Sequence, residues 1–305
     1  MRFSLLSSYT YSPSELLASL PSSRSQFTLA KTFTFDGIGL FTGAPVKMKV
    51  SPAGCGHGIV FKRIDLKGSP EIPALVEYVD DTPRCTILRD GDAQVQTVEH
   101  ILSALRAFNI DNALIEIDGP EIPAADGSAL LFVNEISKNG VKPLTEAIQI
   151  RSLARPVYWT KGDMQLVAIP CEEYKISYTL SYPGHPLLDA QFYSATITPE
   201  LFEKEIAPCR TFSLYEEITP LLEMGLIKGG SLDNGVVVKD DSVMNPGGMR
   251  FSNEMVRHKV LDLIGDLSLV GFPFNAHVFA IRSGHFANAQ FARELRQYFD
   301  QLECE

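Results

Sequence analysis

His258, Asp262 and Asp266 follow one another at intervals of four residues, the spacing that one face of a helix requires. At about 100° per residue, the three side chains span an arc of about 80°. An imidazole and a carboxylate one turn apart can both reach one metal ion without bending the backbone. The opposite side of the same stretch is apolar: Val256, Val260, Leu263, Ile264 and Leu267. The sequence therefore predicts a metal-binding helix over 253–270, and the alternative is an amphipathic helix with a solvated polar face.

Glu99 and His100 form a second pair near the start of another predicted helix. Thr97 has the side chain of an N-cap residue, and the helical pattern continues over 98–108. If His100 binds a metal ion, Glu99 points about 100° away and can contact water beside the ion without being a ligand. In the alternative interpretation, Glu99 interacts with the helix dipole and His100 is a partly buried polar residue.

His285 follows a predicted strand and is expected in a loop. Because imidazole titrates near neutral pH, His285 could donate a proton, and Asp266 could orient its ring. Lys259 lies next to His258 at the edge of the polar helix face, where it could contact a phosphate group. A surface histidine and a solvated lysine are the alternatives.

The composition is that of an ordinary globular protein with room for two domains. The chain has 305 residues, of which 45% are hydrophobic and 21% charged. Its formal net charge of −10 argues against nucleic-acid binding through a broad basic surface. No apolar run approaches the ~18 residues that would span a bilayer. The five cysteines form no CxxC pair, which indicates a reducing compartment and excludes a cysteine-based zinc site of the usual spacing.

Residues 1–26 differ from the rest of the chain because they are rich in serine and contain one acidic residue, Glu15. Their apolar part is too short, and too often interrupted by serine, for a secretory signal. We expect these residues to be disordered, or to precede the true start of the protein, with an organellar transit peptide as the alternative.

Helices and strands are predicted in the same order in the two halves of the chain. The first half has strand-like alternation within 27–79, a helix over 98–108, a strand over 112–118 and a helix over 130–139. The second half has strands over 157–159, 165–169 and 175–180, a helix over 253–270, a strand over 276–281 and a helix over 288–299. His100 and Asp126 are nearly as far apart as His258 and His285, which indicates an internal duplication. We expect two α+β units of similar topology, 27–146 and 150–302, with the active site at their interface.

An additional apolar segment, about 213–241, precedes the predicted metal-binding helix. If 214–224 is helical, one of its faces is apolar: Leu214, Ile218, Leu221 and Leu222. Gly225 would end this helix, and the valines at 236–238 are typical of a strand. Taken alone, the apolar face would simply join the domain core.

Six motifs carry these signals in a fixed order. They are QTVEHILSAL (96–105), EIPAADGS (121–128), RTF (210–212), GGSLDN (229–234), RHKVLDLIGD (257–266) and SGH (283–285). With them the chain closely resembles the UDP-3-O-acyl-N-acetylglucosamine deacetylase family, the zinc amidases of lipid A biosynthesis. The resemblance covers roughly 26–299.

That resemblance implies two tandem α/β sandwich domains of like topology, each with a small insert. It also implies a catalytic zinc ion with an open position and three protein ligands: His100, His258 and Asp262. Glu99 would be the general base, and Thr211 would hydrogen-bond the oxyanion of the reacting amide. His285 would be the cationic partner of the leaving amine, oriented by Asp266.

The resemblance further implies how the rest of the substrate binds. Lys259 would contact the nucleotide diphosphate, and Phe212 would lie against the sugar or the uracil. The segment at about 213–241 would form a hydrophobic passage for the 3-O-acyl chain. Its substrate-binding residues would be Leu214, Ile218 and Gly230.

The implied reaction is hydrolysis of the acetamide of UDP-3-O-acyl-N-acetylglucosamine to acetate and UDP-3-O-acyl-glucosamine, an early committed step of lipid A biosynthesis. The partner is then a small molecule, and we expect a cytoplasmic monomer, or an organellar one if 1–26 is a transit peptide. One alternative substrate is another acylated amino sugar. The other alternative, a binding protein with structural zinc, is disfavoured by Glu99, because a structural site needs no base beside an open metal position.

Overall fold

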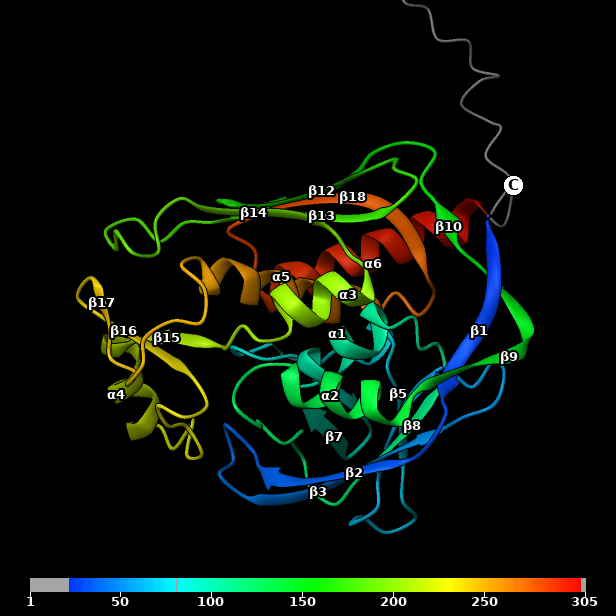
Figure 1. The fold of residues 1–305 in the computed structure, drawn as a ribbon, viewed down its shortest axis with the longest axis horizontal. Coiled ribbons are helices and arrows are strands. Elements are labelled where there is room, and N and C mark those ends of the chain that lie inside the picture. The colour runs from blue at the N-terminus through cyan, green and yellow to red at the C-terminus, as the bar shows by residue number, and fades with distance from the viewer. Residues whose placement is uncertain (1–21, 81, 303–305) are drawn as a thin grey trace, which may run out of the picture.

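The computed structural model describes residues 22–80 and 82–302, which form four layers. A sheet forms each outer layer, and two layers of helices lie between the sheets (Figure 1). The fold is of the α+β class, as the sequence predicts. Within the described residues, no helix is both long and apolar enough to cross a membrane.

The first sheet is built from β2 (Phe33–Ile38), β3 (Pro45–Pro52), β4 (Ile59–Arg63), β5 (Glu71–Pro73) and β8 (Ala113–Ile117). Their spatial order is β2-β3-β8-β4-β5, with β8 parallel to β4 and the other neighbours antiparallel. Every second side chain of β3 is buried, because one face of the sheet packs on the core. That face is covered by α1 (Glu99–Ala107) and α2 (Leu130–Asn139).

The second sheet repeats this plan. It is built from β11 (Val157–Lys161), β12 (Met164–Ile169), β13 (Tyr174–Leu180), β14 (Gln191–Thr196) and β18 (Phe274–Ile281), with β10 (Arg151–Ser152) beside β18. Its order, β11-β12-β18-β13-β14, matches the first sheet in both order and relative strand direction. The two predicted units of similar topology are therefore visible. An origin by duplication, and the boundaries at 27–146 and 150–302, stay predictions.

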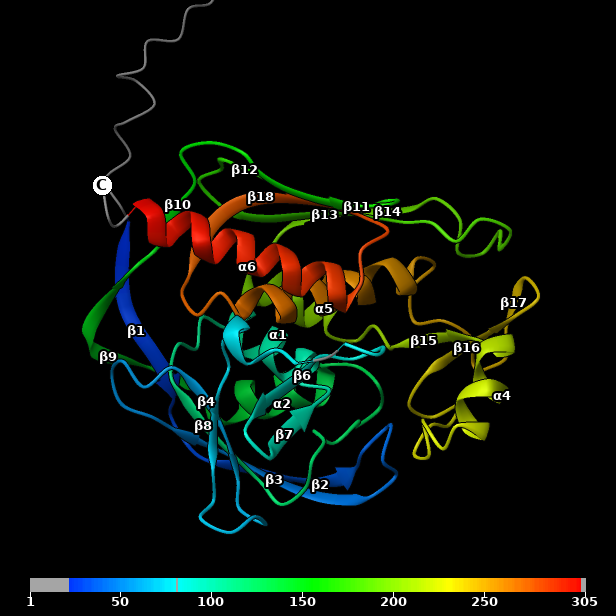
Figure 2. The same ribbon diagram turned by 180° about the vertical axis from the view of Figure 1, so that it is seen from behind.

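The helices α5 (Glu254–Ser268) and α6 (His285–Leu302) cover the inner face of the second sheet. α5 packs against α1 at the centre of the molecule, so the two helix layers meet there (Figure 2). The apolar side of α5 is buried as predicted, but His258, Asp262 and Asp266 are buried as well. The alternative of a solvated polar face is therefore wrong, because α1 and α6 pack on that side.

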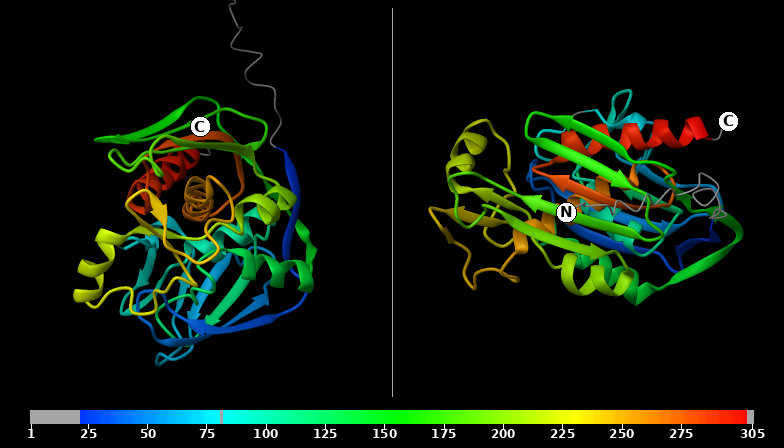
Figure 3. Two further views of the ribbon diagram at one scale, coloured as in Figure 1. Left: turned by 60° about the vertical axis from the view of Figure 1, so that its left-hand side comes forward. Right: turned by 90° about the horizontal axis from the view of Figure 1, so that it is seen from above.

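A long two-stranded ribbon runs along one side of both sheets (Figure 3). It consists of β1 (Ser23–Leu29) and β9 (Val141–Gln149), which pair antiparallel. The predicted leader, 1–26, lies mostly outside the described residues, and its boundary at residue 26 falls inside β1. Arg24 explains part of this difference, since it forms a bidentate ion pair with Asp111 and so fixes the strand against the body.

A small insert projects from one end of the molecule (Figure 1). It contains β15 (Phe212–Leu214), α4 (Tyr215–Glu223), β16 (Val236–Lys239) and β17 (Ser242–Val243). Leu214 was expected in the helix but ends β15, which pairs parallel with β16. Leu222 is 52% exposed, so the predicted apolar face does not include it.

The remaining elements are η1 (Val76–Tyr78), β6 (Ile87–Asp90), β7 (Ala93–Gln96), α3 (Pro199–Leu201) and η2 (Phe202–Ile206). The hairpin of β6 and β7 leads into α1, but Thr97 is not its N-cap. Thr97 has a φ of 60° and its hydroxyl donates to Glu121. His285 also differs from expectation: it begins α6 and is not in a loop, because the amide of Asn288 bonds the carbonyl of Gly284.

Candidate metal centre and active site

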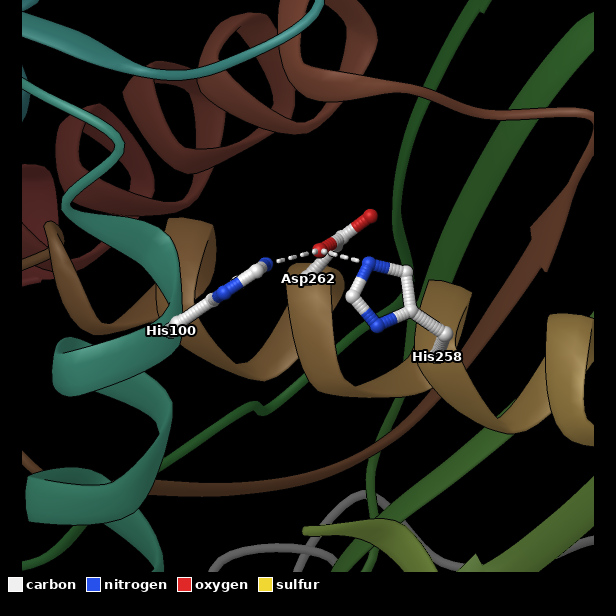
Figure 4. A group of neighbouring side chains, drawn as sticks. All are labelled: His100, His258 and Asp262. Carbon is white, nitrogen blue, oxygen red and sulfur yellow. Dashed lines mark ion pairs between the residues drawn. The ribbon is translucent and has the colours of Figure 1, made fainter. Parts of the chain in front are cut away.

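His100, His258 and Asp262 lie together where α1 meets α5 (Figure 4). One donor atom from each of the three lies within 4.8 Å of the other two. Asp262 Oδ1 is 3.3 Å from His258 Nε2 and 3.7 Å from His100 Nε2. All three side chains are buried. The predicted ligands from the two halves of the chain are thus brought together.

The chemistry of this cluster fits a metal ion. Asp262 Oδ1 is buried and has no hydrogen-bond partner among the described residues, which is costly for a carboxylate oxygen unless an ion binds it. His258 Nδ1 donates to the carbonyl of Cys209 at 3.0 Å, so its Nε2 presents a lone pair to the centre of the cluster. Burial lowers the pKa of His258, and burial with repulsion from His258 lowers the pKa of His100 to about 3. Both imidazoles are therefore neutral, as ligands must be.

Lys259 lies against this cluster and is mostly buried, with 13% of its side chain exposed. Its ammonium donates to Asp262 Oδ2 at 2.8 Å. Burial alone would lower the pKa of Lys259, but Asp262, together with Tyr178 and Tyr182, outweighs it and holds the pKa above the ordinary value. Burial likewise opposes the charge of Asp262, and His258 and Lys259 outweigh it, so the pKa of Asp262 is held low. Asp262 is thus a carboxylate with one oxygen free for an ion.

A second buried cluster contains Glu99, Asp266 and His285. His285 Nδ1 lies 3.0 Å from Asp266 Oδ2, and its Nε2 lies 3.9 Å from Glu99 Oε1 and from Asp262 Oδ2. The two clusters therefore face each other across one short gap. Asp266 lies where an orienting role for His285 requires it.

The pKa values of Glu99 and His285 are both raised. Burial, together with the carboxylates of Asp266 and Asp262, outweighs the attraction of His285 and raises the pKa of Glu99 to about 7. Burial opposes protonation of His285, but Asp266, Glu99 and Asp262 outweigh it and raise its pKa to about 9. A carboxylate of that pKa can accept a proton near neutral pH, and a protonated imidazole can donate one.

Thr86 and Asn288, which the sequence pattern did not indicate, complete this cluster. Thr86 donates its hydroxyl to Asp266 Oδ1 at 2.6 Å, and its amide to Glu99 Oε2 at 3.0 Å. Asn288 donates to Asp266 Oδ2 at 2.8 Å. Asn288 is three residues after His285, so the two side chains share one face of a helix that begins at His285. A predicted helix with that start would have indicated this contact. Thr86 gives no such signal, because it reaches the site only through the fold.

A cavity of about 650 Å³ extends from these clusters into the insert. Its lining contains every predicted site residue except Asp266, Thr211 included. In the insert the lining is mostly apolar, with Phe212, Leu214 and Ile218, and it also includes Glu217, which pairs with Arg84. Gly230 also lines it, as do two further cations, Arg84 and Arg282. The cavity thus joins a polar, ionisable end to an apolar one.

The chain is similar along most of its length to known proteins. Residues 26–297 match the family model described as UDP-3-O-acyl N-acetylglycosamine deacetylase. The chain belongs to this enzyme family. A relative from Chlamydia felis is 48% identical over 89% of this chain and 97% of its own length. Relatives from Chlamydia pneumoniae (47% identical; 89% and 97%) and Chlamydia trachomatis serovar D (44%; 87% and 92%) are similar, and all three are named UDP-3-O-acyl-N-acetylglucosamine deacetylase.

Proposed function

We propose that the chain hydrolyses the acetamide of UDP-3-O-acyl-N-acetylglucosamine, releasing acetate and UDP-3-O-acyl-glucosamine for lipid A biosynthesis. We propose that zinc is the metal, held by His100, His258 and Asp262. The observation that carries this proposal is the buried, unpartnered Oδ1 of Asp262, which faces two neutral imidazoles among the described residues. Two imidazoles and a carboxylate are a ligand set that catalytic zinc sites use. The family membership and the names of the relatives support the substrate.

Zinc, when bound, polarises the acetamide carbonyl and lowers the pKa of a nearby water. Glu99 takes the proton of the attacking water on Oε1, because its Oε2 is occupied by the amide of Thr86. The hydroxyl of Thr211 donates to the oxyanion that develops on the carbonyl. A preorganised donor at this place stabilises the transition state more than the ground state.

His285 then supplies the proton that the leaving amine needs. Its Nδ1 is bonded to Asp266, so the transferable proton is on Nε2, the atom that faces Glu99 across the gap. The Asp266 carboxylate accepts from Thr86 and Asn288 as well, which holds it in place for this contact. The two ionisable side chains thus divide the base and acid roles.

The rest of the substrate would lie along the cavity. The diphosphate would bind Lys259, a local cation in a chain of net negative charge. Arg84 and Arg282 also line the cavity, but they form ion pairs with Glu217 and Asp163. Phe212 would lie against the sugar or uracil; its ring packs edge-on against Tyr182 at 6.1 Å between centroids. The acyl chain would occupy the apolar end, between Leu214, Ile218 and Gly230.

We also propose two domains, 27–146 and 150–302, with the acyl passage at about 213–241. Each domain would have its own sheet and helix pair, which supports this division. We propose that the chain acts as a monomer, since His100, His258 and Asp262 all come from one chain. We propose the cytoplasm as its location.

The test is a substrate panel with the purified chain. UDP-3-O-acyl-N-acetylglucosamine, UDP-N-acetylglucosamine and an acylated amino sugar without the nucleotide are incubated separately, and acetate and free amine are measured by mass spectrometry. We expect rapid release of acetate from the first compound alone. Equal rates with the compound that lacks the nucleotide would favour the other acylated amino sugars. Release from none of the three would favour a binding protein.

A further inference from the structure

The peptide group between Cys209 and Arg210 is bound at both of its polar atoms by one turn of α5. Its carbonyl oxygen accepts from His258 Nδ1 at 3.0 Å. Its N–H donates to Glu254 Oε1 at 3.0 Å. Glu254 and His258 are four residues apart, so they lie on the same face of the helix. A residue outside both clusters therefore fixes the peptide that contacts a metal-ligand candidate.

Glu254 is fully buried, and its two carboxylate oxygens make four hydrogen bonds. Besides the Arg210 amide, Oε1 accepts from Arg210 Nε at 2.9 Å, and Oε2 accepts from Arg210 Nη2 at 3.2 Å and from the Arg250 amide at 2.6 Å. Arg210 Nη2 also donates to the carbonyl of Gly248. Charge-assisted bonds of this number hold the backbone at Arg210 in one orientation.

That orientation bears on which nitrogen of His258 carries the hydrogen. Two acceptors compete for it: the Cys209 carbonyl, 3.0 Å from Nδ1, and Asp262 Oδ1, 3.3 Å from Nε2. If the carbonyl turned away, the carboxylate would draw the hydrogen to Nε2. A protonated Nε2 has no lone pair to offer a metal ion.

We propose that Glu254 is a positioning residue which, through the Cys209–Arg210 peptide, holds His258 with its hydrogen on Nδ1 and so raises the metal affinity of the site. The metal part of this inference rests on the proposed function, and the position of the hydrogen does not. Thr211 is anchored separately, by Gly127 and Val236, so the effect of Glu254 falls on His258 and not on the oxyanion donor.

The first measurement is a long-range ¹H–¹⁵N spectrum of the histidine rings in the metal-free, full-length protein, for the wild type and for Glu254→Ala. The wild type should show the hydrogen of His258 on Nδ1. Glu254→Ala should show a population with the hydrogen on Nε2. Glu254→Gln, which keeps an acceptor oxygen for the Arg210 amide, should restore most of the wild-type signal and guards against failure of the alanine variant to fold.

The matched control is Glu205→Gln. Glu205 forms an ion pair with Arg257 on the same helix, at 2.9 Å, but does not bind the Arg210 amide. The second measurement is zinc affinity by competition with a chelator. We expect about 10- to 100-fold weaker binding for Glu254→Ala, the usual effect of losing a group that orients a ligand, and unchanged binding for the control.

A wild-type spectrum with the hydrogen on Nε2 would overturn the proposal, whatever the variants do. Wild-type spectra and zinc affinity in folded Glu254→Ala would overturn it as well. If the wild type shows the hydrogen on Nδ1 and Glu254→Ala shifts it, but neither binds zinc, the role of Glu254 stands and the proposed metal site fails.

Discussion

Gly265 lies directly against the backbone carbonyl of Glu99: a Cβ atom added to Gly265 would be 2.1 Å from that oxygen. The backbones of α5 and α1 therefore approach more closely than any side chain at this position would allow. The contact lies one residue before Asp266 on α5 and one before His100 on α1. It fixes the position of one helix along the other, and with it the distance between the proposed metal ligands on the two helices.

Gly265→Ala should push the helices apart. Because the carbonyl of Glu99 belongs to a helix and cannot rotate away, we expect the free energy of unfolding to fall by about 1–3 kcal/mol and metal binding to weaken. Urea unfolding with and without metal measures both effects. Gly54→Ala is the control, since nothing in the described residues lies within 4 Å of its added Cβ. Equal unfolding curves for the two variants would show that the contact does not require glycine at position 265.

Glu99→Gln should separate metal binding from turnover. The amide keeps an oxygen for the Thr86 N–H, so the fold and the metal cluster should be preserved. If Glu99 is the general base, as proposed, its loss should slow deacetylation by about 10²–10⁴-fold. Metal content and the rate at saturating substrate are measured together, with the exposed Glu223→Gln as control. A rate near that of the control would remove Glu99 from the chemical step.

The Arg210–Glu254 pair should make stability depend on pH. Burial opposes the charge of Glu254, but the hydrogen bonds from Arg210 and Arg250 outweigh it and hold its pKa below the ordinary 4.5. A pKa lower in the folded than in the unfolded state adds stability that is present above the unfolded value and is lost as the pH falls through the folded one. Glu254→Gln should thus be less stable than the wild type at pH 7, and the difference should shrink below about pH 4. Urea unfolding of both proteins across this range is the measurement, and a pH-independent difference would contradict the argument.

Gly235→Leu should shorten the acyl chain that the enzyme prefers. The position lines the cavity, and the nearest atoms to an added Cβ are 3.8 Å away, so a side chain fits there and would take up cavity space. Affinity should otherwise grow with chain length, by about 0.8 kcal/mol per buried methylene. Rates with substrates of different acyl length test this, and Leu214→Trp is a second probe. An unchanged length profile in both variants would mean that the acyl chain lies elsewhere.

The sequence predicts the parts of this site that repeat along a helix or follow one another directly. His258, Asp262 and Asp266 could be placed on one face because the helical period fixes their directions. The hydrogen bonds of Thr86 and Glu254 could not, because they join segments that only tertiary packing brings together. Thr97 was misread for a related reason: its hydroxyl has a distant partner, Glu121, that outweighs the local capping role.

The repeated order of strands was visible in the sequence, but the ribbon of β1 and β9 was not. Serine-rich residues 23–25 carry little strand signal, and they are ordered by pairing with a segment far along the chain. The sequence does not mark the start of α6 at His285, because the glycine before it is typical of a loop. In each case a long-range contact or a helix end overrides the local pattern.

Removal and return of the metal tests the central claim most directly. The purified chain is stripped of metal with a chelator, and zinc is added back in steps. At each step the amount of bound metal and the acetate released from UDP-3-O-acyl-N-acetylglucosamine are both measured. The His258→Ala variant is treated in the same way. We predict that release is lost on stripping and returns in proportion to zinc until one ion is bound per chain, and that His258→Ala neither binds the ion nor recovers. Full release from the stripped wild type, or full recovery of the variant, would contradict the account.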